Sequence, residues 1–197
     1  ELMALAPGLA DGVRFVFPMA PLSLGGYGPW ESRAWWHLDP ARLEALMRGG
    51  SAAPLTEEEP EGLAAARRKL LGVIEAVRQS TGLAMDRIVL GGFSQGAMLV
   101  TDTALRLEEA PAALGIFSGT VIHRAEWTRR APTRRGLRVL QAHGRTDALL
   151  PFSIAEELRD LLTEAGLTVD FHSFNDGHTI DRASLAAFAR LAAELKG

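Results

Sequence analysis

The stretch Gly92-Phe93-Ser94-Gln95-Gly96 decides the fold of this chain. It follows the apolar run Ile88-Val89-Leu90 and leads into Ala97-Met98-Leu99-Val100. This order predicts a strand, a sharp turn and a helix, with Ser94 at the tip of the turn. The backbone of such a turn is strained, and side chains on the flanking glycines would collide with the crossing segments. We therefore expect Gly92 and Gly96 to leave the Ser94 hydroxyl accessible, with the Gln95 amide facing any negative charge that develops there.

Composition narrows the classes of protein to which the chain can belong. The 197 residues are 47% hydrophobic and 23% charged, which predicts one compact domain over 1–197 with a substantial core. The net charge of -3, with no basic stripe, argues against nucleic-acid binding. The absence of cysteine excludes disulfides, thiolate metal sites and a cysteine nucleophile. No apolar run reaches the ~20 residues that span a bilayer. We expect a cytoplasmic location, although a chain that begins at Glu1 says nothing about a signal peptide.

Short apolar runs alternate with amphipathic segments along the chain. This alternation predicts an α/β fold, with a mostly parallel central sheet and helices on both faces. Strands are expected at Val13–Phe17, Ile88–Leu90, Leu114–Phe117, Leu137–Ala142 and Val169–Phe174. A helix that ends near Gly82 precedes the serine turn, and further helices follow each later strand except Leu114–Phe117.

Two stretches lack a sustained period. Residues 19–54 hold three of the four tryptophans, namely Trp30, Trp35 and Trp36. A long loop this rich in aromatics is expected to be a wall on the substrate side of the protein. Residues 120–135 are expected to be a polar connection that contains Trp127.

Three polar residues each follow a predicted strand. Ser94 follows Ile88–Leu90, Asp147 follows Leu137–Ala142, and His178 follows Val169–Phe174. Because the carboxyl ends of parallel strands meet at one edge of a sheet, these side chains are expected to converge. The order Ser, Asp, His along the chain is that of the α/β-hydrolases. His178 would take the proton of the Ser94 hydroxyl, and Asp147 would hold the imidazole in the required tautomer.

Other interpretations of these residues are open. G-x-S-x-G can form an ordinary turn, and His178 can be a helix N-terminal residue beside a carboxylate. Asp176 competes with Asp147 but precedes His178 by only two residues, which is poor geometry for holding the ring. The further competitors are Asp86 and Asp102, which lie near the elbow in sequence. His143 is expected to form a structural hydrogen bond. The remaining histidines lack partners at metal-ligand spacing, so neither a metal nor a cofactor is expected.

The segment Ile88–Ala97 resembles the elbow of the phospholipase/carboxylesterase family, which includes the acyl-protein thioesterases. His143-Gly144-Arg145-Thr146-Asp147 and Gly177-His178 match that family in order and spacing. Phe17-Pro18-Met19-Ala20-Pro21 resembles its proline-containing segment, and Trp35-Trp36 the aromatic stretch that follows.

This resemblance implies a serine esterase with an α/β-hydrolase fold and no large lid domain, acting on small carboxylic esters or acyl thioesters. It implies Ser94, Asp147 and His178 as the catalytic residues and the Gln95 backbone amide as one donor of the oxyanion hole. Trp35, Trp36 and Phe93 are candidates for an apolar acyl or aryl pocket. A homodimer is left open.

The chain departs from the family pattern at its start. The family has an earlier strand and a His-Gly loop that supplies the second oxyanion donor, and nothing before Val13 matches them. Because loss of one such donor costs ~10²–10³ in rate, we expect the sequence to be incomplete at its start. Ester hydrolysis is the main hypothesis. The alternatives are an acyl-thioesterase or lysophospholipase activity, and a non-catalytic binding protein on a hydrolase scaffold.

Overall fold

The computed structural model describes residues 12–26 and 32–194. Its centre is a parallel sheet with the strand order β3-β4-β5-β6. The strands are β3 (Val89–Phe93), β4 (Ala113–Phe117), β5 (Arg138–Gly144) and β6 (Thr168–Phe174). Four of the five expected strands are therefore confirmed, with ends that differ by a few residues.

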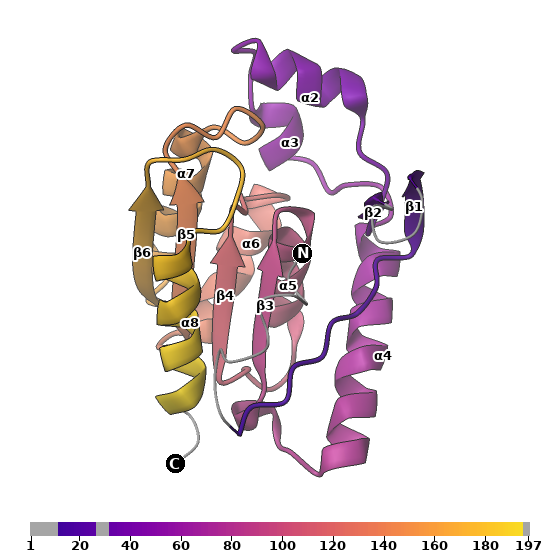
Figure 1. Ribbon diagram of the computed structural model, residues 1–197, viewed down its shortest axis with the longest axis vertical. Helices are drawn as coiled ribbons and strands as arrows, with labels where there is room; N and C mark the ends of the chain where they lie inside the picture. Colours follow the sequence, from indigo (N-terminus) through magenta and orange to yellow (C-terminus); the bar gives the residue numbers. More distant parts are fainter. Residues whose placement is uncertain (1–11, 27–31, 195–197) are drawn as a thin grey trace.

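Helices cover both faces of this sheet, as the alternation of segments predicts (Figure 1). One face carries α8 (Arg182–Glu194), and the other carries α5 (Gln95–Arg106), α6 (Arg124–Arg130) and α7 (Phe152–Glu164). Strand β4 contributes alternate residues to two hydrophobic clusters. Leu114 and Ile116 belong to the larger cluster, whereas Ala113 and Phe117 pack in the cluster that contains α8. A strand buried on both faces reads as a continuous apolar run for this reason.

The N-terminal part adds short elements beside the sheet. Strands β1 (Leu22–Gly25) and β2 (Ser32–Ala34) pair in antiparallel fashion. Helices α2 (Pro40–Met47) and α3 (Ala53–Thr56) lie beyond the carboxyl ends of the parallel strands, and α4 (Leu63–Thr81) flanks the sheet (Figure 1). The expected loop over 19–54 is therefore wrong in part. Each element that the structure describes in this stretch spans eight residues or fewer, which is too short for a sustained period in the sequence. As expected, α4 ends at Gly82, whose φ of +71° only glycine adopts readily.

The expected strand at Val13–Phe17 is wrong, because the structure gives this segment no β pairing. Its side chains still alternate between half-buried and exposed, and the rings of Phe15 and Phe17 stack with centroids 6.1 Å apart. Alternation reports which side of an extended chain faces the protein. A strand also needs hydrogen bonds to a neighbouring strand, which the pattern does not report.

The expected polar connection over 120–135 is also wrong. It contains α6 and a 3₁₀ turn, η3 (Ala131–Arg134). The five arginines make this segment look polar in the sequence. It nevertheless has an apolar side, because Val121, Ile122 and Trp127 are fully buried. Glu126 accepts hydrogen bonds from Arg129 and Arg130 of the same short helix and from Arg106 on α5, so these charged side chains have ionic partners.

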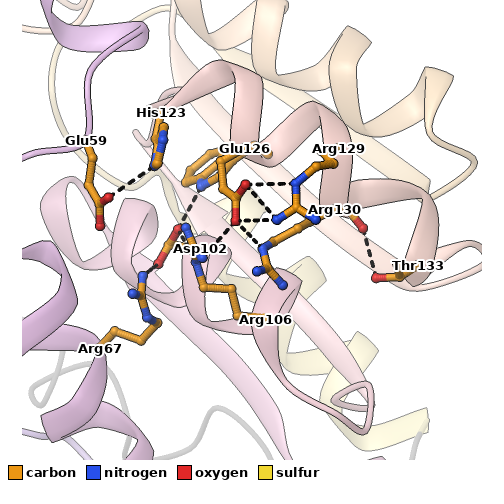
Figure 2. Close-up of polar contacts among 10 residues, drawn as sticks. Glu59, Arg67, Asp102, Arg106, His123, Glu126, Arg129, Arg130 and Thr133 are labelled. Carbon is orange, nitrogen blue, oxygen red and sulfur yellow. Dashed lines mark hydrogen bonds and ion pairs between the residues drawn. The ribbon is translucent and has the colours of Figure 1, made fainter.

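A buried ionic network joins three of the helices (Figure 2). The Asp102 side chain on α5 is fully buried and accepts from Arg67 on α4, from Arg106, and from the Trp127 indole on α6. The Trp127 Nε1 to Asp102 Oδ1 distance is 3.0 Å. Arg106 continues the network to Glu126 at 2.9 Å. Asp102 is therefore engaged in holding α4, α5 and α6 together.

Candidate active site

Ser94 stands at a strained turn between β3 and α5. Its φ of +54° and ψ of -122° fall in a region that costs a non-glycine residue about 1–3 kcal/mol. The Ser94 amide donates to the Phe117 carbonyl at 2.8 Å, which ties the turn to the end of β4. A Cβ on Gly92 would lie 2.3 Å from the carbonyl carbon of Gly96, so this position requires glycine.

The steric expectation for Gly96 is wrong. A Cβ at this position would meet only the indole Nε1 of Trp35, at an ordinary contact distance of 3.8 Å. The crossing backbone therefore leaves room for a side chain there. What lies over Gly96 is an aromatic ring from the segment that follows β2.

Ser94, His178 and Asp147 form one hydrogen-bonded chain across the carboxyl edge of the sheet. His178 Nε2 lies 2.9 Å from Ser94 Oγ, and His178 Nδ1 lies 2.7 Å from Asp147 Oδ2. Because an ionised carboxylate only accepts, Nδ1 carries the hydrogen and Nε2 presents its lone pair to the serine hydroxyl. The His178 side chain is 17% exposed, while that of Asp147 is fully buried. The arrangement can move a proton from the hydroxyl to the imidazole and stabilise the cation that results.

The Asp147 carboxylate is held by four donors. Oδ1 accepts from the amides of Leu149 and Leu150, each at 2.9 Å, and Oδ2 accepts from His178. His143 Nε2 lies 3.3 Å from the same Oδ2. Burial raises the pKa of Asp147, but the hydrogen bonds from His143, His178 and Leu150 outweigh it and hold the pKa below its ordinary value. Asp147 is therefore a carboxylate throughout the neutral range.

His143 is fully buried near the end of β5 and makes two polar contacts with the loop that carries Asp147. Its Nε2 also lies 2.9 Å from the carbonyl oxygen of Leu150. A carbonyl only accepts, so Nε2 carries the hydrogen and donates toward both oxygens. The structural hydrogen bond expected of His143 is present, whereas its contact with Asp147 is not anticipated from the sequence. The sequence feature that could have indicated this contact is the four-residue spacing of His143 and Asp147 within one turn.

The turns that carry Asp147 and His178 pack backbone against backbone. A Cβ on Gly144 would lie 2.2 Å from the Gly177 carbonyl oxygen and 2.3 Å from that of Asp176. The Thr146 amide donates to the Asp176 carbonyl at 3.1 Å. The Asp176 carboxylate accepts from the Gly177 amide at 2.7 Å rather than from the His178 ring. Asp176 therefore contributes to the shape of the turn.

The end of β4 supports the turn of His178 as well. Ser118 has a φ of +47°, is fully buried, and donates its hydroxyl to the Thr179 carbonyl at 2.9 Å. Strand β4 lies between β3 and β5 in the sheet. Phe117, the last residue of β4, therefore holds the Ser94 turn, and Ser118, which follows it, holds the His178 turn.

The candidate pocket aromatics occupy different environments. The Phe93 ring lies 4.9 Å from the His178 ring, centroid to centroid. Trp35 is half-buried, whereas Trp36 is 3% exposed and belongs to the larger core cluster. Trp30 lies outside the described residues. Phe93 and Trp35 therefore remain pocket candidates, whereas Trp36 is a core residue.

The described ranges show no group of three or more histidine or acidic side chains placed to hold a metal ion. Within the same ranges, no helix has both the length and the apolar character needed to cross a membrane.

A serine at a strained elbow, on a parallel sheet with helices on both faces, defines the α/β-hydrolase fold class. The model of the phospholipase/carboxylesterase family matches residues 51–192, and the chain belongs to this family. Acyl-protein thioesterase 1 of Mycosarcoma maydis is 30% identical over 191 residues, covering 88% of this chain and 73% of that protein. Acyl-protein thioesterase 1 of Eremothecium gossypii is 28% identical over 170 residues, covering 83% of this chain and 64% of that protein. The match thus spans less than two thirds of the second relative.

Solved structures agree on the fold. The crystal structure of esterase PE8 has a TM-score of 0.67 at 27% identity, covering 90% of this chain and 76% of that one. Arabidopsis thaliana SOBER1 has a TM-score of 0.70 at 19% identity, covering 92% and 83% of the two chains. The second likeness, at this low identity, supports the fold alone.

Proposed function

We propose that the protein is a serine carboxylesterase that hydrolyses small carboxylic esters through an acyl-enzyme. The observation that carries this proposal is the continuous hydrogen-bonded chain from Ser94 Oγ through His178 to Asp147, with distances of 2.9 and 2.7 Å. Membership of the phospholipase/carboxylesterase family supports the class of reaction.

In the first half-reaction, Ser94 Oγ attacks the acyl carbonyl carbon while His178 Nε2 takes the hydroxyl proton. The imidazolium that forms is stabilised by the buried Asp147 carboxylate. The carbonyl π electrons move to oxygen, and this oxyanion accepts a hydrogen bond from the Gln95 amide. That amide is the first of α5, where backbone N–H groups have no intrahelical acceptor and the helix dipole favours negative charge. The intermediate collapses, and the leaving alcohol takes the proton from His178.

In the second half-reaction, water attacks the acyl-serine while His178 takes one of its protons. The tetrahedral intermediate expels Ser94 Oγ, which recovers its proton from His178, and the carboxylic acid leaves. The half-buried Trp35 and Phe93 are proposed to border the acyl group, because one lies over Gly96 and the other lies against the His178 ring. The expected substrates therefore carry an apolar acyl or aryl group.

A thioester is the second candidate substrate, because two of the similar proteins are named acyl-protein thioesterases. The same three residues serve both reactions, and only the leaving group differs. Hydrolysis of an oxygen ester and a thioester with the same acyl chain separates them. A higher kcat/KM for the oxygen ester, after allowance for the uncatalysed rate of each, supports the carboxylesterase proposal. The reverse order favours the thioesterase.

The proposal itself is tested by hydrolysis of p-nitrophenyl esters by wild type and Ser94→Ala. The wild type is expected to hydrolyse several acyl lengths, and the variant to fall to the background rate while unfolding at the wild-type temperature. A Ser94→Ala variant as active as wild type contradicts the proposal. Absence of hydrolysis by a folded wild type, with retained affinity for acyl compounds, favours the binding-protein alternative.

A further inference from the structure

The side chain of Gln95 joins the nucleophile turn to a segment 60 positions away in the sequence. Gln95 directly follows Ser94, opens α5, and is 9% exposed. Its Oε1 accepts from the Trp35 amide at 2.6 Å, and its Nε2 donates to the Trp36 carbonyl at 3.0 Å. Both ends of one amide are thus used by two successive residues, in the way one strand pairs with another. We call these two bonds the Gln95 clamp.

The clamp holds two tryptophans with different positions. The Trp36 ring is buried in the core. A Cβ added to Gly62, at the start of α4, would lie only 2.9 Å from the Cβ of Trp36, so the backbone packs closely there. Trp36 is therefore held from two sides. Trp35 is half-buried, and its Nε1 lies against Gly96, within the first turn of α5. The Trp35 ring therefore lies over α5 at Gly96, which is two residues after Ser94 in the sequence.

We propose that the Gln95 side chain is a specificity-determining positioning residue, which fixes the Trp35 ring beside the nucleophile and so sets the acyl preference. This inference rests on the proposed esterase function. The clamp binds the backbone of Trp35. Its loss therefore keeps the indole ring in the protein but removes the hydrogen bond that fixes the position of the ring. A ring that shifts changes the space open to the acyl chain, and apolar pockets discriminate through such differences in fit.

The side chain and the backbone of Gln95 have separate roles. The amide N–H proposed to bind the oxyanion belongs to the main chain, so it is present in every variant except proline. Loss of oxyanion stabilisation lowers the rate for every ester, since every ester forms the same oxyanion. Loss of the clamp lowers the rate according to the acyl chain. The two effects are therefore distinguished by the dependence of kcat/KM on acyl length.

The test compares wild type with Gln95→Met, whose side chain has similar length and lacks both hydrogen-bonding groups. The p-nitrophenyl esters of acetate, butyrate, octanoate and laurate are assayed under the same conditions. The ratio of kcat/KM between the best long-chain ester and acetate is expected to change by about tenfold, the discrimination that one methylene gives in an apolar pocket. Gln79→Met is the matched control. Gln79 is an exposed residue of α4 bonded only to Glu75 in the described structure, and its variant is expected to keep the wild-type ratio.

A double-variant cycle identifies Trp35 as the residue through which Gln95 acts. In a Trp35→Ala background, Gln95→Met is expected to change the chain-length ratio no further, because contacting residues are non-additive. If Gln95→Met does not fold, Gln95→Glu replaces it. That variant keeps the acceptor for the Trp35 amide but places a carboxylate oxygen against the Trp36 carbonyl.

Several results overturn the inference. If a Gln95 variant lowers kcat/KM equally for all four esters, the Gln95 side chain has only a structural role or a role in oxyanion binding. Effects of Gln95→Met and Trp35→Ala that add in full show that the two act independently. A wild type that hydrolyses no ester removes the proposed function, and the inference with it. A wild type with a clear chain-length preference that Gln95→Met leaves intact removes the inference alone.

Discussion

Replacing Gly144 by alanine separates the two turns that carry Asp147 and His178. The new Cβ would lie 2.2 Å from the Gly177 carbonyl oxygen, although ordinary contact begins at 3.4 Å. Both clashing oxygens belong to the backbone of residues 176 and 177, so no side-chain rotation relieves the overlap. The turns must move apart by about 1 Å, and the 2.7 Å hydrogen bond between His178 and Asp147 spans that gap. Misplacement by about 1 Å in a catalytic group can cost ~10²-fold in rate.

We therefore expect Gly144→Ala to lower kcat for p-nitrophenyl butyrate by about 100-fold. Overpacking should lower its free energy of unfolding by about 1–3 kcal/mol. Gly177→Ala is the matched control, because it lies on the facing turn and its Cβ would meet nothing closer than the Thr146 carbonyl at 3.9 Å. Its free energy of unfolding should stay within about 0.5 kcal/mol of wild type. Urea unfolding and steady-state kinetics measure both quantities. Equal activities in the two variants refute the reasoning, because only one of them has the clash.

Three further predictions concern buried polar groups. Asp102→Ala leaves two arginines without their buried carboxylate and should lower the free energy of unfolding by about 3–5 kcal/mol in urea, with the activity of each folded molecule retained. His143→Phe removes one donor to Asp147, so it should lower kcat with little change in KM, while His143→Gln restores part of the loss. The folded pKa of Asp147 lies below the unfolded value of about 3.9, so its ionised form stabilises the fold above about pH 4 and this contribution is lost as the pH falls. In urea unfolding at a series of pH values, wild type should therefore lose stability below about pH 4 more steeply than Asp147→Asn does.

Each of these has a contrary result. An Asp102→Ala variant of wild-type stability shows that the network contributes nothing net. If His143→Phe lowers only the thermal midpoint, with normal turnover for each active site titrated by a fluorophosphonate, His143 has a structural role alone. Parallel pH profiles for wild type and Asp147→Asn mean that the carboxylate is not stabilised by its donors.

The sheet and the three polar residues at its edge could be predicted because each depends on local pattern. Short apolar runs mark β3 to β6, and Ser94, Asp147 and His178 each follow one of them. Parallel strands with right-handed crossovers then bring these strand ends to one edge. No long-range contact needs to be known for that step.

Features that depend on tertiary contacts could not be predicted. The Gln95 clamp joins residues 60 positions apart, and nothing in its neighbourhood marks the partner. The alternation in Val13–Phe17 reports burial but not the absence of a paired strand. The proximity of Asp102 to the elbow in sequence makes it a competitor of Asp147, and only its tertiary partners on α4 and α6 show its structural role. Gly96 resembles Gly92 in sequence, yet only Gly92 faces a backbone that excludes a side chain.

His178 and Asp147 are proposed to make Ser94 a nucleophile. The most direct test is reaction of the folded, full-length protein with a fluorophosphonate probe, followed by peptide mass spectrometry to locate the adduct. We expect one adduct, on Ser94, and its loss in both Ser94→Ala and His178→Ala. A folded wild type that does not react, or an adduct that forms in His178→Ala at the wild-type rate, shows that these two residues do not activate Ser94.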